Sequence, residues 1–213
     1  MRVGLARRVL LPWLVFVVVS MGSLATYAQI PGAPAAPPLI LPDLGTLKGD
    51  EEQFTMLLFI HPQCSCSHAT IDQLSRVMAR STGSARVTAV FLKPKGTPEG
   101  WERTDLWRSA AAIPGVEVIA DPGGRTAARF GVETSGQVLL YRPDGRLAFR
   151  GGLTSGRGHT GDSVGSASLQ ALFAGGTQWT SGTATFGCGL FDPVQEEEGA
   201  DDCINHGDGV QRP

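Results

Sequence analysis

The fold is decided by the stretch Met56-Leu-Leu-Phe-Ile-His-Pro-Gln-Cys64-Ser-Cys66-Ser-His-Ala-Thr-Ile-Asp-Gln-Leu74. It opens with five consecutive apolar residues, 56–60, a pattern typical of a strand that is buried on both faces. Apolar side chains then recur at the spacing of a helix that Gly83 would end, at Ile71, Leu74, Val77 and Met78. The stretch therefore predicts two cysteines at the junction between a buried strand and a helix.

Strand-like and helix-like patterns continue to alternate along the rest of the chain. Strand patterns cover 86–93, 116–120, 137–141 and 146–150, and helix patterns cover 101–112, 124–130 and 166–174. Pro143-Asp-Gly145, between the last two strand patterns, predicts a hairpin. This order predicts an α/β domain with a mixed central sheet, helices on both faces, and a C-terminal β-hairpin plus helix.

The position of Cys64 favours a reactive sulfur. A side chain at the start of a helix lies near unpaired amide groups and the positive end of the helix dipole, which together stabilise a thiolate. Residues two apart in a regular helix are rotated by about 200°, so Cys64 and Cys66 can form a bridge only if Cys64 lies outside the helix. A ring that small should be strained, and strained disulfides are the labile ones. The spacing predicts a catalytic or sensing pair.

Residues 59–74 resemble the thioredoxin-superfamily stretch that reads Phe-Trp-Ala-x-Trp-Cys-x-x-Cys, and they are closest to its exported branch of thiol–disulfide oxidoreductases. Cys64 falls on the attacking cysteine without a gap, and Ser67 falls on the resolving cysteine. The order of elements over residues 44–175 also fits that fold. The chain is similar, too, to an uncharacterised bacterial exported group labelled RedB. The resemblance implies a thioredoxin-like fold and protein thiols or disulfides as partners.

The resemblance also implies roles for individual residues. It predicts an exported thiol–disulfide oxidoreductase with Cys64 as the nucleophile. Because residue 67 is serine, resolution must come from Cys66, from an external thiol, or not at all, and we expect Cys66 to be the resolving partner. We expect Ser67 to hydrogen-bond the Cys64 thiolate. Gly136 stands where the family usually has a proline before its substrate-pairing strand, so we expect the backbone of Gly136 and Gln137 to pair with substrate.

Two other classes of function stay open. The cysteines lie in a dense run of soft and borderline ligands, His61-x-x-Cys64-x-Cys66-x-His68, which suits Cu(I) or Zn²⁺. Exported copper-delivery proteins of the Sco type also use a thioredoxin fold, with paired cysteines and a distant histidine. The alternative function is therefore a copper-binding delivery module that uses Cys64, Cys66 and His159, whereas the redox hypothesis needs no cofactor. A third alternative is a degenerate thioredoxin fold that serves only as a binding partner.

Two further cysteines, Cys188 and Cys203, lie near the C-terminus. In an oxidising compartment they are candidates for a disulfide with each other. The sequence does not fix that pairing, and Cys188 could instead return to the active site as a resolving thiol.

The N-terminus has the composition of an export signal. Three arginines precede an apolar run, 9–24, and small residues follow it up to Ala28. The run is also about as long as the shortest membrane-spanning helices, roughly 17 residues. A cleaved signal peptide (1–28) and a retained membrane anchor both place the domain outside the cytoplasm, because the positive charges stay inside. The predicted location is the periplasm, either free or attached to the membrane.

The remaining chain divides into a Pro/Ala-rich linker (29–43), the thioredoxin-like domain (44–175) and a Gly-rich, acidic tail (176–213) that we expect to be mostly solvated loop. A length of 213 residues with 42% hydrophobic content predicts one domain plus extensions. The net charge is −2, so the composition offers no basic patch and predicts no nucleic-acid partner. The oligomeric state does not follow from the sequence.

Overall fold

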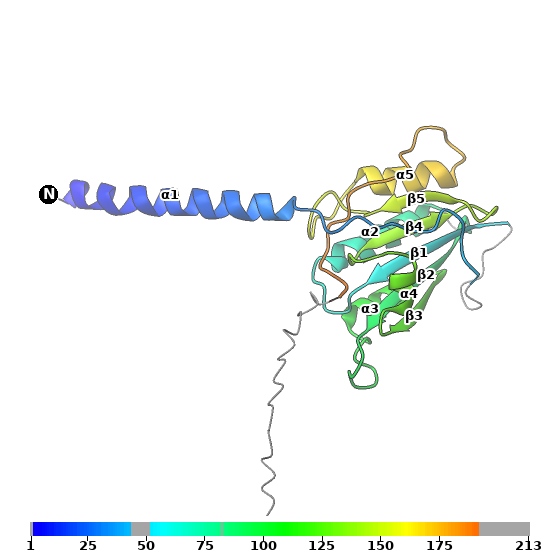
Figure 1. Cartoon of the computed structure of the whole chain (residues 1–213). Helices are drawn as coiled ribbons and strands as arrows, with labels where there is room; N and C mark the ends of the chain where they lie inside the picture. The colour runs from blue at the N-terminus through cyan, green and yellow to red at the C-terminus, as the bar shows by residue number, and fades with distance from the viewer. Residues whose placement is uncertain (1, 44–51, 82, 192–213) are drawn as a thin grey trace, which may run out of the picture.

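The computed structural model describes residues 2–43, 52–81 and 83–191 (Figure 1). Its elements follow the predicted order of alternating strands and helices, then a hairpin and a last helix. They are α1 (Arg2–Ala28), β1 (Phe54–Ile60), α2 (Ser67–Arg80), β2 (Ala85–Lys93), α3 (Asp105–Ala111), β3 (Val116–Pro122), α4 (Arg125–Arg129), β4 (Gln137–Tyr141), β5 (Leu147–Gly151) and α5 (Val164–Phe173).

β1 lies in the centre of a five-stranded sheet of order β3-β2-β1-β4-β5. It pairs in parallel with β2, where Ile60 lies opposite Phe91, and antiparallel with β4, where Phe59 lies opposite Gln137. β4 and β5 are antiparallel across a turn at Gly145, whose φ of 79° favours glycine. The predicted mixed sheet and terminal hairpin are confirmed.

The side chains of β1 alternate between two hydrophobic cores, one on each face of the sheet. Met56, Leu58 and Ile60 belong to the core that α2, α3 and α5 cover. Leu57 and Phe59 belong to the core that α4 covers. All five side chains are buried, so the prediction of a strand buried on both faces is confirmed, as is the presence of helices on both faces.

α1 extends away from the sheet as an apolar helix (Figure 1). Its segment Leu10–Ala28 is 19 residues long, has a mean hydropathy of 1.8, and has none of its tested window buried by the rest of the described chain. Large apolar side chains such as Trp13 and Phe16 are exposed. A helix of this kind near the N-terminus suits a signal peptide or an anchor, and the choice between the two stays a prediction.

Two segments on either side of the domain in the sequence pack against it. In the linker 29–43, the carbonyl of Leu39 accepts a hydrogen bond from the N–H of Leu147 at 2.8 Å. In the tail, residues 183–190 run across the domain, and Leu190 is only 2% exposed. Residues 183–190 therefore differ from the expected solvated loop, because their backbone groups bind the domain rather than water.

Candidate functional site

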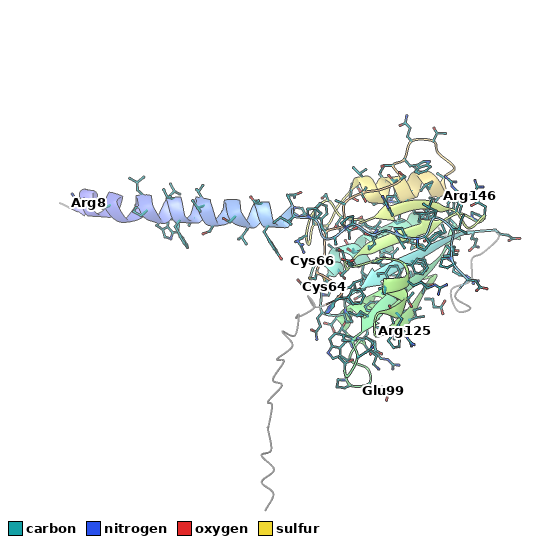
Figure 2. The ribbon with its side chains drawn as sticks, in the orientation of Figure 1. Arg8, Cys64, Cys66, Glu99, Arg125 and Arg146 are labelled. Carbon is teal, nitrogen blue, oxygen red and sulfur yellow. The ribbon has the colours of Figure 1, made fainter. Side chains whose placement is uncertain are left out.

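Cys64 lies in the turn that joins β1 to α2, immediately before the helix. Its N–H donates to the carbonyl of His61 at 3.0 Å, and its own carbonyl accepts from the N–H of Ser67 at 3.0 Å. α2 begins at Ser67, with Cys66 as its N-cap residue. Cys64 thus lies outside the helix, which is the condition for any bridge between Cys64 and Cys66. Figure 2 shows both cysteines at this end of the domain, near the base of α1.

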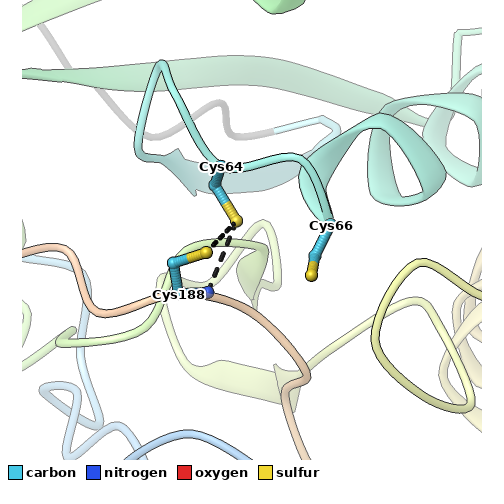
Figure 3. Close-up of side chains that lie close together, drawn as sticks. All are labelled: Cys64, Cys66 and Cys188. Carbon is cyan, nitrogen blue, oxygen red and sulfur yellow. Dashed lines mark hydrogen bonds between the residues drawn. The ribbon is translucent and has the colours of Figure 1, made fainter. Parts of the chain in front are cut away.

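Cys188 joins the pair from the C-terminal segment (Figure 3). Its Sγ lies 2.9 Å from the Sγ of Cys64, and its N–H donates to the Cys64 sulfur at 3.4 Å. The sulfurs of Cys64, Cys66 and Cys188 all lie within 4.8 Å of one another. Cys203, the other candidate partner of Cys188, lies outside the described residues.

The protein shifts the pKa values of Cys64 and Cys188 in opposite directions. Burial by itself raises the pKa of Cys64, whose side chain is buried. Hydrogen bonds from Cys188 and Ser67, each through side chain and backbone, outweigh burial and hold the pKa of Cys64 below its ordinary value of 9.0. Burial, the hydrogen bond to Cys64 and the charge of the neighbouring sulfurs raise the pKa of Cys188 to about 12. Cys64 is thus the more acidic of the two thiols, and Cys188 is the one that donates the hydrogen bond.

Ser67 supports the thiolate from the first turn of α2. Its hydroxyl and N–H both act to lower the pKa of Cys64, and the residue is buried. The Ser67 Oγ also lies 2.8 Å from the Oγ of Ser135, which in turn accepts from the N–H of His61 at 2.8 Å. This network fixes the Ser67 hydroxyl beside Cys64, and a catalytic role for that contact stays a prediction.

The backbone at Gly136 is already hydrogen-bonded within the chain. The Gly136 N–H donates to the carbonyl of Phe59 at 2.7 Å, and its φ of 88° favours glycine at this position. Gln137 begins β4, and its side-chain Oε1 accepts from Thr185 Oγ1 at 2.6 Å. Substrate pairing by Gly136 and Gln137 stays a prediction.

The residues just before Gly136 hold the C-terminal segment. The N–H of Ser135 donates to the carbonyl of Cys188 at 2.9 Å, and the N–H of Leu190 donates to the carbonyl of Glu133 at 2.8 Å. Between these two bonds, residues 134 and 189 form an antiparallel bridge. Residues 188–190 therefore lie along residues 133–135 as a short antiparallel strand would.

The histidines weighed as metal ligands do not join the thiols. His68 and His159 are both exposed. Within the residues that the structure describes, the group of candidate metal ligands close enough to share an ion consists of the three cysteines. His159 lies outside that group, so the structure does not bring together the ligand set Cys64, Cys66 and His159.

A cavity of about 380 Å³ opens beside Cys64. Its lining includes Pro62, His68 and Thr104, and it includes no residue of the segment 183–190. The cavity therefore borders Cys64 on a side that residues 183–190 do not line, and Cys64 itself is only 1% exposed.

Arg157 is a site residue that the sequence did not predict. Its Nη1 donates to the carbonyl of Gly187 at 2.6 Å, its Nε donates to the carbonyl of Ile30 at 3.2 Å, and its N–H donates to the carbonyl of Ala28 at 2.9 Å. Its positive charge also acts on the Cys188 thiol in the direction of a lower pKa. The sequence held one signal for the close packing of the segment that Arg157 binds, namely the two glycines that flank Cys188, since glycine allows two backbones to approach closely.

No protein-family model matches the sequence, and no curated protein matches it. Among solved structures, a hypothetical protein from Sinorhizobium meliloti 1021 is 21% identical, with 76% of this chain and 93% of that chain covered and a TM-score of 0.55. An uncharacterized conserved protein from Geobacillus kaustophilus is 18% identical, with 78% and 94% covered and a TM-score of 0.56. A secreted Mycobacterium tuberculosis disulfide oxidoreductase, described as homologous to E. coli DsbE, is 17% identical, with 70% and 98% covered and a TM-score of 0.41.

The first two likenesses show a shared fold, and the likeness to the group labelled RedB stays a prediction. The order of the sheet, with a cysteine directly after its central strand and before α2, is that of the family that residues 59–74 resemble. The chain therefore has a thioredoxin-like fold.

Proposed function

We propose that the chain is an exported thiol–disulfide oxidoreductase in which Cys64 is the attacking nucleophile. The observation that carries this proposal is the pairing of a low-pKa sulfur at Cys64 with a protonated thiol 2.9 Å away. A thiolate beside a second thiol is the pair of groups that thiol–disulfide exchange requires. Protein thiols or disulfides are the expected substrates.

The exchange has two steps. The Cys64 sulfur attacks one sulfur of a substrate disulfide, which forms a mixed disulfide and releases the other substrate sulfur as a thiolate. A second thiol of the protein then attacks the Cys64 sulfur, which closes an internal disulfide and releases the rest of the substrate. The Cys-x-Cys spacing favours Cys66 for this step. Ser67 stabilises the thiolate, and the backbone of Gly136 and Gln137 guides an extended substrate.

The test is reduction of a fluorogenic peptide disulfide by the reduced full-length chain in a mild detergent. Cys64→Ser should abolish the reaction, because the attacking sulfur is gone. Ser75→Ala is the matched control, since Ser75 is an exposed serine farther along the same helix. Equal rates for the parent and Cys64→Ser would reject the proposed function and leave two hypotheses, copper delivery and a fold that serves only for binding.

Export rests on α1, whose apolar segment Leu10–Ala28 follows basic residues at the N-terminus. We expect a reporter fused after Pro213 to be active in the periplasm. Replacing Arg2, Arg7 and Arg8 by glutamate should reduce that activity, because the basic residues hold the N-terminus inside. A reporter that is active only in the cytoplasm would reject export.

A copper-binding delivery module is the second candidate, because three sulfurs within 4.8 Å of one another form a soft ligand set. On this hypothesis the reduced chain takes up Cu(I) against a competing chelator. Binding is weakened by Cys64→Ser and by Cys188→Ser, and it is unchanged by His159→Ala because His159 lies outside the cluster. Tight copper binding without disulfide reduction would replace the redox function, and no uptake would reject the copper function.

A further inference from the structure

The segment 183–190 is built into the domain by hydrogen bonds along its length. Upstream of Cys188, the N–H of Thr183 donates to the carbonyl of Arg150 at 3.1 Å, and the carbonyl of Thr185 accepts from the N–H of Gly32 at 2.9 Å. Downstream, the segment pairs with residues 133–135 as described above. Cys188 is therefore held from both sides, and its position beside Cys64 does not depend on its own side chain.

Glycine at position 187 allows the segment to lie this close. A Cβ atom there would overlap the carbonyl oxygen of Ser135, so no other residue type fits without moving the backbone. At Gly189, on the other side of Cys188, a Cβ atom would lie 3.2 Å from the carbonyl oxygen of Phe191, a far smaller overlap than at Gly187. Gly187 thus allows the close approach of its segment to Ser135, next to which Cys188 meets Cys64.

The Cys64 sulfur lies close to a bonding distance from Cys188. The two Sγ atoms are 2.9 Å apart, whereas a disulfide bond is about 2.05 Å long. Cys66 lies in the same cluster, but Figure 3 shows its side chain extending alongside that of Cys64, and the hydrogen-bonded contact is the one to Cys188. Cys188 therefore needs less movement than Cys66, the N-cap residue of α2, to form a bond with Cys64.

We propose that Cys188 is the resolving thiol of this site, delivered by the segment 183–190, and that substrate reaches Cys64 from the cavity lined by Pro62, His68 and Thr104. This inference rests on the proposed redox function and changes its second step. The Cys188 sulfur attacks the Cys64 sulfur of the mixed disulfide, the Cys64–Cys188 bond forms, and the substrate sulfur leaves as a thiolate. Two electrons pass from the two protein thiols to the substrate disulfide, and the proton of Cys188 passes to the departing substrate thiolate, directly or through solvent.

The charge on Cys64 affects the pKa of Cys188 before and after the first step. In the reduced protein the negative sulfur of Cys64 accepts the hydrogen bond of Cys188 and keeps Cys188 protonated. When Cys64 enters a mixed disulfide, that charge and that hydrogen bond disappear, while Arg157 still favours the Cys188 thiolate. The formation of the mixed disulfide therefore removes the contributions of Cys64 that raise the pKa of Cys188.

The experiment adds oxidised glutathione to the reduced full-length chain in a Cys203→Ser background. Tryptic mapping separates the outcomes, because residues 49–76 hold Cys64 and Cys66 while residues 158–213 hold Cys188. The parent should yield these two peptides joined by a disulfide, with Cys66 free for alkylation. The joined peptides are detected in the parent itself, so this result does not depend on whether any further variant folds.

Two further variants separate the possible failures. Cys188→Ser should accumulate the glutathione adduct on Cys64, whereas Cys66→Ser should proceed to the joined peptides. The opposite result would be an adduct that accumulates in Cys66→Ser and a disulfide within peptide 49–76 in Cys188→Ser. It would overturn the role of Cys188 and keep the redox function. An absence of adduct and disulfide in every variant would overturn the redox function itself.

Discussion

The backbone of Gly187 lies so close to the carbonyl oxygen of Ser135 that a Cβ atom at position 187 would overlap that oxygen. Gly187→Ala should therefore push the segment 183–190 away from residues 133–135. We expect Cys64 to become more accessible and its alkylation by iodoacetamide at neutral pH to become faster. Formation of the Cys64–Cys188 disulfide should slow in the same variant.

Gly189→Ala is the matched control for this prediction, since it adds the same methyl group on the other side of Cys188 and meets a far smaller overlap. Its alkylation rate should stay close to that of the parent. Equal rates for Gly187→Ala and the parent would mean that the contact with Ser135 does not hold the segment in place.

Removal of the Cys188 thiol should raise the pKa of Cys64. Hydrogen bonds from Cys188 help to hold that pKa below 9.0, whereas burial opposes them. Cys188→Ala removes the side-chain bond and leaves burial in place, so thiolate formation should shift to higher pH. The pH dependence of ultraviolet thiolate absorbance measures the shift. Cys66→Ala is the comparison, and a rise of equal size in that variant would assign the effect to the cluster rather than to Cys188.

The free energy of unfolding of the reduced protein should depend on pH in two directions. The folded-state pKa of Cys64 is lowered, so its contribution is present above the unfolded pKa near 9.0 and is lost as pH falls through the folded pKa. The pKa of Cys188 is raised to about 12, so its contribution is present below 9.0 and is lost as pH rises from 9.0 towards 12. Cys188→Ala should remove the part of this loss that begins near pH 9.0, whereas burial of Tyr141, which raises the pKa of its hydroxyl above 10.0, leaves a loss at higher pH.

Urea unfolding at a series of pH values, in excess reductant, measures this dependence. Cys66→Ala should retain the alkaline loss that Cys188 causes. The same alkaline slope in Cys188→Ala and the parent would contradict the assignment.

Asp121→Ala should destabilise the face of the sheet that α4 covers. The buried carboxylate of Asp121 accepts from the N–H groups of Thr126 and Ala127, both at 2.9 Å, in the first turn of α4. Hydrogen bonds to a charged group contribute about 1.5–3 kcal/mol each, so we expect a loss of about 2–4 kcal/mol in the free energy of unfolding. Asp121→Asn keeps one acceptor and should lose less. Urea unfolding that gives equal losses would argue against capping.

The sheet and the Cys64 turn were predictable because their signals are local. The apolar run 56–60, the helical spacing that follows it and the turn at Gly145 each involve neighbouring residues. The position of Cys64 outside α2 followed from the same stretch. These features depend on the backbone conformation of short segments, which short segments of sequence specify well.

The place of Cys188 was not predictable in the same way. It contacts Cys64 across 124 positions, and its segment binds the domain through backbone groups and close glycine contacts rather than through a run of apolar side chains. Glycine, threonine and serine have the composition of a solvated loop, so composition gave the opposite expectation for 183–190. His159 was chosen from its Gly-rich loop, and the structure leaves it exposed and outside the thiol cluster.

The contacts of Arg157 limit how far the cysteine cluster can lie from a lipid bilayer when α1 is retained in it. Arg157 binds the end of α1 through Ala28 and holds the Cys188 segment through Gly187, and Gly32 is already fixed to Thr185. Only residues 29–31 separate the helix from the domain, and this connecting segment spans on the order of 10 Å even when fully extended. In a chain retained in the membrane through α1, the thiols would work at the lipid surface and serve partners that are themselves membrane-bound or that come to it.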